Sequence, residues 1–155
     1  MTIYTIGYEG LSLGQFLELL KVNAIERLVD IREAPISRKA GFAKAALSAA
    51  VETAGIRYSH VRALGCPKPI RDRQKATGDW ARYSRDFRIY LAGQNDALAE
   101  LRRTVASART CLLCYEADFR RCHRSFVAEA VARAGEDIRH IPVKPPSPQA
   151  ELAFS

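Results

Sequence analysis

Short apolar runs of strand length alternate along the chain with longer segments whose apolar residues recur at helical spacing. The apolar runs predict strands at 3–7, 27–31, 56–60, 110–115 and 137–141. The helical spacing predicts helices at 12–23, 42–53, 82–106 and 125–133. Successive strand, helix and strand units require right-handed crossovers and a parallel sheet. We therefore expect one three-layer α/β domain, Rossmann-like, with about five mainly parallel strands in the order 3-2-1-4-5 and helices on both faces.

Local signals mark where several elements begin and end. Ser12, with Gln15 three residues later, has the pattern of a helix capping box. Over residues 61–80, glycines and prolines interrupt the hydrophobic pattern, which predicts a long loop of the kind that often carries function. The prolines near the end of the chain can join neither a helix nor a sheet. We therefore expect the domain to cover residues 1–142 and an extended tail to cover 143–155.

Composition limits the function classes and the location. The chain has 155 residues, of which 48% are hydrophobic and 26% charged, and this is an ordinary globular composition. No apolar run approaches the roughly 20 residues of a membrane-spanning helix, and the first residues lack a secretory signal. We therefore expect a cytoplasmic protein without membrane partners, in which cysteines are reduced thiols and disulfides are not expected.

The charge balance indicates the kind of partner. The formal charge of +7 comes from 24 basic and 17 acidic residues, and most of the basic residues are arginines. Arginine binds phosphate oxygens through two parallel N–H groups, so this composition favours a phosphate-bearing partner. A GC-rich genome produces the same arginine bias, and the net charge leaves both explanations open.

Three of the four cysteines and one of the three histidines lie between residues 111 and 123. This segment leaves the carboxyl end of a predicted strand and enters a predicted helix. Unpaired backbone N–H groups and the helix dipole favour anions at such an entrance. Cys122, His123 and Arg124 stand there, and the neighbouring positive charge would lower the pKa of the Cys122 thiol. Cys122 is thus a candidate nucleophile, and the alternative is a small residue packed beneath the loop.

Polar side chains also follow the other predicted strands at their carboxyl ends, where open parallel sheets bind ligands. We expect these side chains to converge on one crevice that binds a small anionic ligand. The predicted catalytic residues are Cys122, Glu116 and His60, and the predicted ligand-binding residues are Tyr8, Glu9, Asp30, Arg32, Arg38, His123 and Arg124. Structural alternatives remain open, because Glu116 would also pair with Arg32 or Arg124, and Asp30 with Arg32 would also lock the following loop.

Several short motifs occur in a specific combination. They are Thr5-Ile-Gly-Tyr-Glu9, Leu28-Val-Asp-Ile-Arg32, Leu64-Gly65, and a Cys-x-x-Cys-x-Glu segment followed by Cys122-His-Arg124. In this combination the chain resembles the domain of unknown function 488 family over nearly its whole length. The resemblance implies a compact bacterial α/β domain without an established activity. The chain departs from the expected pattern at Phe119, where proline is expected, and at Cys66, where a second glycine is expected.

A metal site is a further interpretation of the cysteines, because Cys-x-x-Cys forms half of many zinc sites. Residues three apart on a strand point to opposite faces, so Cys111 and Cys114 would not bind one ion together. We therefore predict no metal and no other cofactor, with Cys111 as a core thiol. A site made of Cys114, Cys122 and His123 stays open as an alternative. Cys66, in the predicted loop, is expected to be accessible.

Nucleic-acid binding is the rival function class. Seven basic and three acidic residues lie between residues 68 and 88, interleaved with aromatic residues. Basic groups for phosphates and rings for bases are typical of proteins that bind single-stranded nucleic acid. The candidates in the basic segment 68–90 are Lys68, Arg71, Arg73 and Trp80, and the alternative is a solvated loop followed by an amphipathic helix. Neither a Walker phosphate loop nor a Gly-x-Gly-x-x-Gly element is present, which argues against P-loop nucleotidases and dinucleotide enzymes.

Overall fold

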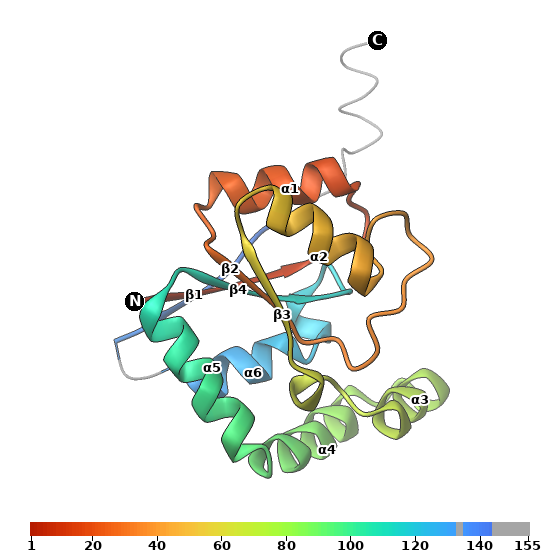
Figure 1. Cartoon of the computed structure of the whole chain (residues 1–155). Coiled ribbons are helices and arrows are strands. Elements are labelled where there is room, and N and C mark those ends of the chain that lie inside the picture. Colours follow the sequence, from red (N-terminus) through yellow and green to blue (C-terminus); the bar gives the residue numbers. More distant parts are fainter. Residues whose placement is uncertain (133–134, 144–155) are drawn as a thin grey trace, which may run out of the picture.

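The computed structural model describes residues 1–132 and 135–143, and these residues form a five-stranded sheet (Figure 1). The strands are β1 (Thr2–Gly7), β2 (Arg27–Asp30), β3 (Arg57–His60), β4 (Thr110–Cys114) and β5 (Asp137–His140). They pair in the order β3-β2-β4-β1-β5, and every pair is parallel. The predicted α/β fold with a parallel sheet is confirmed.

The predicted strand order 3-2-1-4-5 is wrong, because β4 and not β1 lies beside β2. All five residues of β4 are buried, as a central strand requires. β1 is also buried at five of its six positions, so the two apolar runs look alike in the sequence. The observed order places the carboxyl end of β4 between those of β1 and β2.

Helices cover both faces of the sheet, as predicted (Figure 1). They are α1 (Leu13–Val22), α2 (Lys44–Thr53), α3 (Lys68–Thr77), α4 (Trp80–Ala92), α5 (Asn95–Ser107) and α6 (Arg124–Val131), with 3-10 helices η1 (Arg62–Leu64) and η2 (Phe119–Arg121). One hydrophobic cluster contains Phe16 of α1 and Leu47 of α2. The other contains Phe87, Leu101 and Val127 of α4, α5 and α6. The chain therefore leaves β1 and β2 toward one face and β4 toward the other, an arrangement that creates ligand sites in open parallel sheets.

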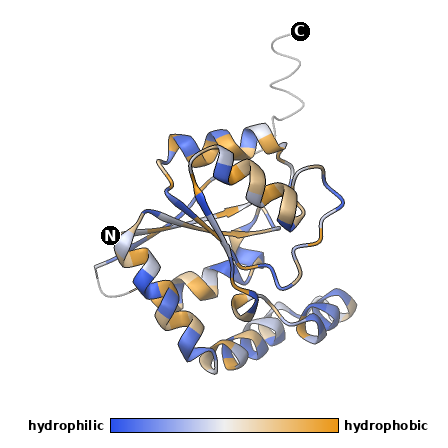
Figure 2. Cartoon of the chain, viewed as in Figure 1, coloured by the Kyte–Doolittle hydropathy of each residue, from blue (hydrophilic) through white to orange (hydrophobic). Residues whose placement is uncertain are grey.

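Residues 61–80, predicted to be a loop, contain η1 and the ten-residue helix α3. No residue of α3 is buried, and Ile70 is its one apolar side chain packed against the core. The hydrophobic pattern therefore does not mark this helix, and Figure 2 shows α3 as mainly hydrophilic. The helix ends at Gly78, whose φ of 66° lies in the left-handed region that glycine adopts readily.

The helix predicted over residues 82–106 is divided into α4 and α5 by Gly93 and Gln94. Each of the two helices buries its own apolar face, with Leu91 near the end of α4 and Leu98 near the start of α5. The apolar residues continue at helical spacing across the break, which is why the sequence pattern indicated one helix.

Three other expectations concern boundaries and membrane segments. The capping box of α1 is confirmed, since the Ser12 hydroxyl accepts the Gln15 N–H and the Gln15 side chain accepts the Ser12 N–H.

In the part of the chain that the structure describes, no helix is long and apolar enough to cross a membrane. Of the predicted tail, the structure describes Val143, which is buried, and residues 144–155 lie outside the described residues.

Candidate functional site

A cavity of about 510 Å³ lies at the carboxyl ends of β1, β2 and β4. Its walls come from Tyr8 after β1, from the loop between β2 and α2, from α3 with the start of α4, and from residues 114–123 after β4. Among the predicted site residues, the cavity is lined by Tyr8, Arg32, Arg38, Glu116 and His123, and also by Arg71 and Trp80 of the nucleic-acid alternative. The site lies where open parallel sheets bind ligands.

Asp30 and Arg32 form a buried ion pair at the end of β2. The two Asp30 oxygens accept hydrogen bonds from Arg32 Nε at 2.8 Å and Nη2 at 2.7 Å, which is a bidentate arrangement. The Tyr58 hydroxyl donates to Asp30 at 2.5 Å, and Arg32 Nη1 donates to the Phe42 carbonyl at 2.7 Å. Burial opposes the charge of Arg32, but the hydrogen bonds and charge of Asp30 raise the pKa of Arg32 above its ordinary value. Asp30 therefore locks Arg32 and the following loop and does not line the cavity.

Tyr8 joins the end of β1 to the loop that follows β2. Its ring stacks on Phe42 with 4.4 Å between centroids and 9° between planes. Its hydroxyl donates to Ser37 at 3.3 Å and accepts from Arg32 Nη1 at 3.4 Å. These contacts fix one wall of the cavity.

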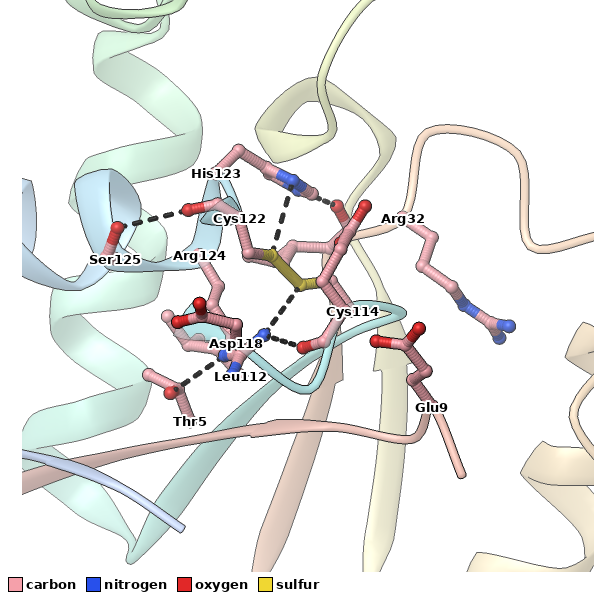
Figure 3. Close-up of a disulfide and its surroundings, with 12 residues drawn as sticks. Thr5, Glu9, Arg32, Leu112, Cys114, Asp118, Cys122, His123, Arg124 and Ser125 are labelled. Atoms are coloured by element: carbon pink, nitrogen blue, oxygen red, sulfur yellow. Dashed lines mark hydrogen bonds between the residues drawn. A yellow bond between two sulfur atoms is a disulfide. The ribbon is translucent and has the colours of Figure 1, made fainter. Parts of the chain in front are cut away.

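Arg124 is completely buried and does not line the cavity. Its Nε donates to the Thr5 hydroxyl at 3.0 Å and its Nη2 to the Ala117 carbonyl at 3.2 Å. Its Nη1 donates to the Glu116 carbonyl and to Cys114 Sγ, the latter at 3.4 Å (Figure 3). Burial lowers the pKa of Arg124 to about 10, so the side chain is still charged at neutral pH. These donors already have acceptors within the protein, and the predicted ligand-binding role of Arg124 stays a prediction.

Cys114, Cys122 and His123 form a buried cluster (Figure 3). Cys114 and Cys122 are joined as a disulfide, which contradicts the expectation that all cysteines are reduced. The turn between β4 and α6 brings the two sulfurs together although the two cysteines are eight positions apart in the sequence. His123 Nε2 lies 2.7 Å from the Ile31 carbonyl oxygen, and its Nδ1 lies 3.9 Å from Cys122 Sγ. Burial lowers the pKa of His123 to about 4, so its imidazole is neutral at pH 7.

Cys122 is not a free thiol in this structure, and its predicted role as a nucleophile stays a prediction. Its sulfur is bonded to Cys114, its side chain is 1% exposed, and it does not line the cavity. The entrance of α6 places this sulfur beneath the loop, as the packing alternative expects. Cys114 is the member of the pair that lines the cavity.

The other two cysteines are free and buried. Cys111 packs beside Leu113 in the cluster under α1 and α2, so it faces away from Cys114 as predicted. Cys66 is 1% exposed, and the expectation that it is accessible is wrong, because its side chain belongs to the hydrophobic cluster that also contains Leu64 and Tyr83. Burial raises the pKa of Cys66 to about 11.

Glu116 lines the cavity and makes no ion pair within residues 1–132 and 135–143. The predicted pairing with Arg32 or Arg124 is not formed, because Arg32 pairs with Asp30 and Arg124 bonds the backbone carbonyl of Glu116. Burial raises the pKa of the Glu116 carboxyl above its ordinary value. A role of Glu116 as a general acid or base stays a prediction.

Glu9 and His60 lie near strand ends but do not line the cavity. Glu9 is exposed, and its carboxylate accepts the N–H of Ala117 at 3.0 Å. His60 Nε2 lies 2.7 Å from the Arg32 carbonyl oxygen. Both side chains support the backbone of loops that form the cavity, and the structure places neither where it would contact a ligand there.

Three cations around the cavity make no ion pair in the described chain: Arg38 from the loop after β2, Lys75 from α3 and Arg121 from η2. The Arg121 guanidinium lies over the ring of Trp80, 5.8 Å from its centroid. Sequence reasoning did not select Lys75 or Arg121 as site residues. Exposed basic residues are abundant in this chain, so no local signal separates these two from the others.

The model of a family described as a domain of unknown function, DUF488, matches residues 12–131. The chain belongs to the DUF488 family. The resemblance seen in the sequence motifs is thereby confirmed, and the matched range contains every cavity-lining residue except Tyr8. No curated protein and no solved structure matches the chain.

The basic segment of this DUF488 chain, residues 68–90, is largely neutralised within the fold. The predicted nucleic-acid contacts form ion pairs with acidic side chains: Lys68 with Asp72 at 2.7 Å, Arg71 with Glu33 at 2.8 Å and Arg73 with Asp86 at 3.0 Å. Trp80 stacks on Tyr83 with 4.5 Å between ring centroids. Nucleic-acid binding by this segment stays a prediction that no contact tests.

Two residues depart from the pattern expected of the DUF488 family. Phe119 stacks on His140 with 3.8 Å between ring centroids and 7° between planes, so it packs η2 against β5. Cys66 forms part of the cavity wall. Phe119 and Cys66 therefore both lie close to the site, the first in a ring stack and the second in the cavity wall.

Proposed function

We propose that the cavity of this DUF488 protein binds a small phosphate-bearing or other anionic ligand. The supporting observation is that Arg38, Lys75 and Arg121 surround one cavity from three separate segments and lack ion-pair partners among the described residues. Guanidinium and ammonium groups form charge-assisted hydrogen bonds with phosphate oxygens. Unpaired cations at one site are most stable when an anion binds between them.

The other charges of the cavity mostly cancel. Arg32 is paired with Asp30, and Arg71 is paired with Glu33. Glu116 is the cavity carboxyl group without an ion pair in the described chain, and burial favours its neutral form by raising its pKa. The balance at the cavity is therefore positive, which favours an anionic ligand.

The size and the rings of the cavity favour a ligand with an organic part. A volume of about 510 Å³ is within the range of about 300–1,000 Å³ that small-molecule sites occupy. Tyr8, Trp80 and Tyr115 contribute aromatic surface to the walls. A phosphate ester would use both the cations and the rings. Glu116, the predicted acid–base residue, also lines this cavity.

Ligand-dependent thermal unfolding tests this proposal. Phosphate, sulfate and adenosine monophosphate, each added at millimolar concentration, should raise the melting temperature by mass action, whereas sodium chloride of equal ionic strength should not. Removing one charge-assisted hydrogen bond costs roughly 1.5–3 kcal/mol, so Lys75→Gln and Arg121→Gln should each weaken binding at least about tenfold.

Arg103→Gln is the matched control, because Arg103 is exposed on α5 and does not line the cavity. This variant should bind the anions as the wild-type protein does. The proposal is overturned if no anion exceeds the sodium chloride effect, or if Arg103→Gln weakens binding as much as Arg121→Gln does.

A further inference from the structure

We propose that Cys114, Cys122 and His123 bind a divalent transition-metal ion, of which zinc is the expected example, when the two cysteines are reduced. The two sulfur atoms and an imidazole nitrogen lie within 4.8 Å of one another. All three side chains are buried, with exposures of 1%, 1% and 7%. Two thiolates and one imidazole are a donor set that zinc prefers. The proposed metal ligands are different residues from Arg38, Lys75 and Arg121, although Cys114 and His123 border the same cavity.

The His123 ring is oriented as a metal ligand requires. Its Nε2 lies 2.7 Å from the Ile31 carbonyl, which only accepts, so Nε2 carries the proton. The lone pair of Nδ1 is then directed to the side where Cys122 Sγ lies, 3.9 Å away. Bond lengths of about 2.3 Å for zinc–sulfur and about 2.0 Å for zinc–nitrogen put the two ligand atoms of a tetrahedral site about 3.5 Å apart. A hydrogen bond from the second ring nitrogen to a backbone carbonyl is the usual support of metal-binding histidines.

The surroundings of the sulfurs also suit two thiolates. Arg124 Nη1 donates to Cys114 Sγ at 3.4 Å, and its positive charge is buried beside the pair. The Cα atoms of Cys114 and Cys122 are 7.6 Å apart, beyond the roughly 4.4–6.8 Å that disulfides usually span. Thiolates that share a metal ion reach further, because the ion adds two bonds between the sulfurs and separates them by about 3.8 Å.

Strand geometry opposes a metal ion held by both Cys111 and Cys114, since these two face opposite sides of β4. Cys122 and His123 come from the turn into α6, so strand geometry does not separate them from Cys114. Within the described residues the cluster contains three ligands, and two of them, Cys114 and His123, line the cavity. Three protein ligands with a fourth position open to a cavity are typical of catalytic rather than structural zinc sites.

Metal binding requires reduction of the disulfide. A dithiol reductant would donate two electrons and two protons, break the sulfur–sulfur bond to give two thiols, and become a disulfide itself. The ion then displaces both thiol protons and forms two metal–sulfur bonds. The cytoplasm, which remains a predicted location, keeps thiols reduced. The three residues would therefore bind the ion in the reduced protein and lose it on oxidation.

Titration of the reduced protein with cobalt(II) alone tests this inference. We expect one equivalent to bind, with the thiolate-to-cobalt charge-transfer absorption and the visible bands of a tetrahedral ion, and zinc should displace it. Cys122→Ser and His123→Asn should each weaken cobalt binding at least a hundredfold. Cys66→Ser is the matched control, because Cys66 is a buried thiol of the same cavity outside the cluster, and it should bind as the wild type does.

A second measurement does not depend on the folding of any variant. Wild-type protein treated with a diazene oxidant, which accepts the two electrons and two protons as it becomes a hydrazine, should release the cobalt and regain it after reduction. Alkylation of a separate sample should first show that both thiols are free, and circular dichroism that the reduced protein is folded. The inference is overturned if this reduced wild-type protein shows no charge-transfer absorption with equimolar cobalt. It is also overturned if Cys66→Ser abolishes binding and Cys122→Ser does not.

Discussion

Arg124 and Arg121 are three residues apart, yet the fold uses them in opposite ways. Arg124 is 0% exposed and donates to carbonyl, hydroxyl and sulfur acceptors inside the protein. Arg121 is exposed, lies over Trp80 and has no ion-pair partner in the described chain. A buried guanidinium must have its donors satisfied by the protein, so it has few left for a ligand. At the scale of single residues, burial thus separates structural cations from those available for binding.

Gly7 provides a test at this scale, because it lets the loop after β4 pass against the end of β1. A Cβ at this position would overlap the Glu116 backbone carbonyl and lie 3.0 Å from Arg124 Nη1. We expect Gly7→Ala to lower the free energy of unfolding by about 3 kcal/mol, because the backbone there would have to move. Urea unfolding measures this effect.

Gly14, in α1, is the matched control for Gly7. A Cβ there would meet no atom within 4 Å, and alanine is the better helix former, so Gly14→Ala should be neutral or stabilising by up to about 1 kcal/mol. Equal destabilisation by both substitutions would show that Gly7 has no special contact with the loop.

Among the elements, α3 is the one whose position depends most on polar contacts. It has no buried residue, and it contributes Arg71, Gln74 and Lys75 to the cavity wall. Arg71 Nε donates to the Cys66 carbonyl at 3.0 Å, and Arg71 Nη2 donates to Glu33 at 2.8 Å. The bond to Glu33 joins α3 to the loop after β2, so it holds together two walls of the cavity, and the bond to Cys66 fixes the segment just before α3.

We expect Arg71→Gln to loosen α3 without unfolding the protein. Loss of a half-buried ion pair should cost about 1 kcal/mol, which is roughly a fivefold faster amide exchange in α3. Hydrogen exchange followed by mass spectrometry measures the change helix by helix. Lys68→Gln removes an exposed ion pair within α3 and should alter exchange less than about twofold. The proposed role of Arg71 fails if both variants behave alike or if exchange rises equally across the sheet.

At the scale of the whole molecule, folding is linked to pH through histidine. His140 of β5 bonds the Thr5 hydroxyl at 2.5 Å and stacks on Phe119. Burial and then the charge of Arg124 lower the pKa of His140 to about 4, and burial lowers the pKa of His123 to the same value. The ordinary pKa is about 6.5, so between about pH 4 and 6.5 the unfolded chain binds more protons. The stabilisation from neutral histidine is therefore complete above about pH 6.5 and decreases as the pH falls toward 4.

A comparison of wild-type protein with His140→Gln isolates this contribution from the titration of carboxyl groups. Between about pH 7.5 and pH 5, His140 takes up a proton in the unfolded wild-type chain, which lowers the stability of the wild-type protein, whereas His140→Gln has no such group. The difference in unfolding free energy between the two proteins should therefore shrink over this range. Urea unfolding at several pH values within this range measures it. A difference that does not change with pH would contradict the assigned linkage.

The elements themselves were predictable from local pattern. Apolar runs located every strand that the structure describes, and Ser12 with Gln15 marked the start of α1, because these signals depend on neighbours in the sequence. The hydrophilic α3 and the break between α4 and α5 were missed, since one buries no residue and the other does not interrupt the apolar spacing. The density of cysteine and histidine after β4 also pointed correctly to a side-chain cluster.

The sequence by itself determined the α/β class, the family resemblance and the strand ends at which polar residues gather. Tertiary structure alone decided the central place of β4, the internal hydrogen bonds of Asp30 and Arg124, and the burial of Cys66 in the hydrophobic core. Periodicity reports whether a residue is buried, but it does not report which distant partner it meets. Glu33 and Arg71 are 38 residues apart and pair across the cavity, so which cations remain free for a ligand depends on contacts that only the folded chain brings together.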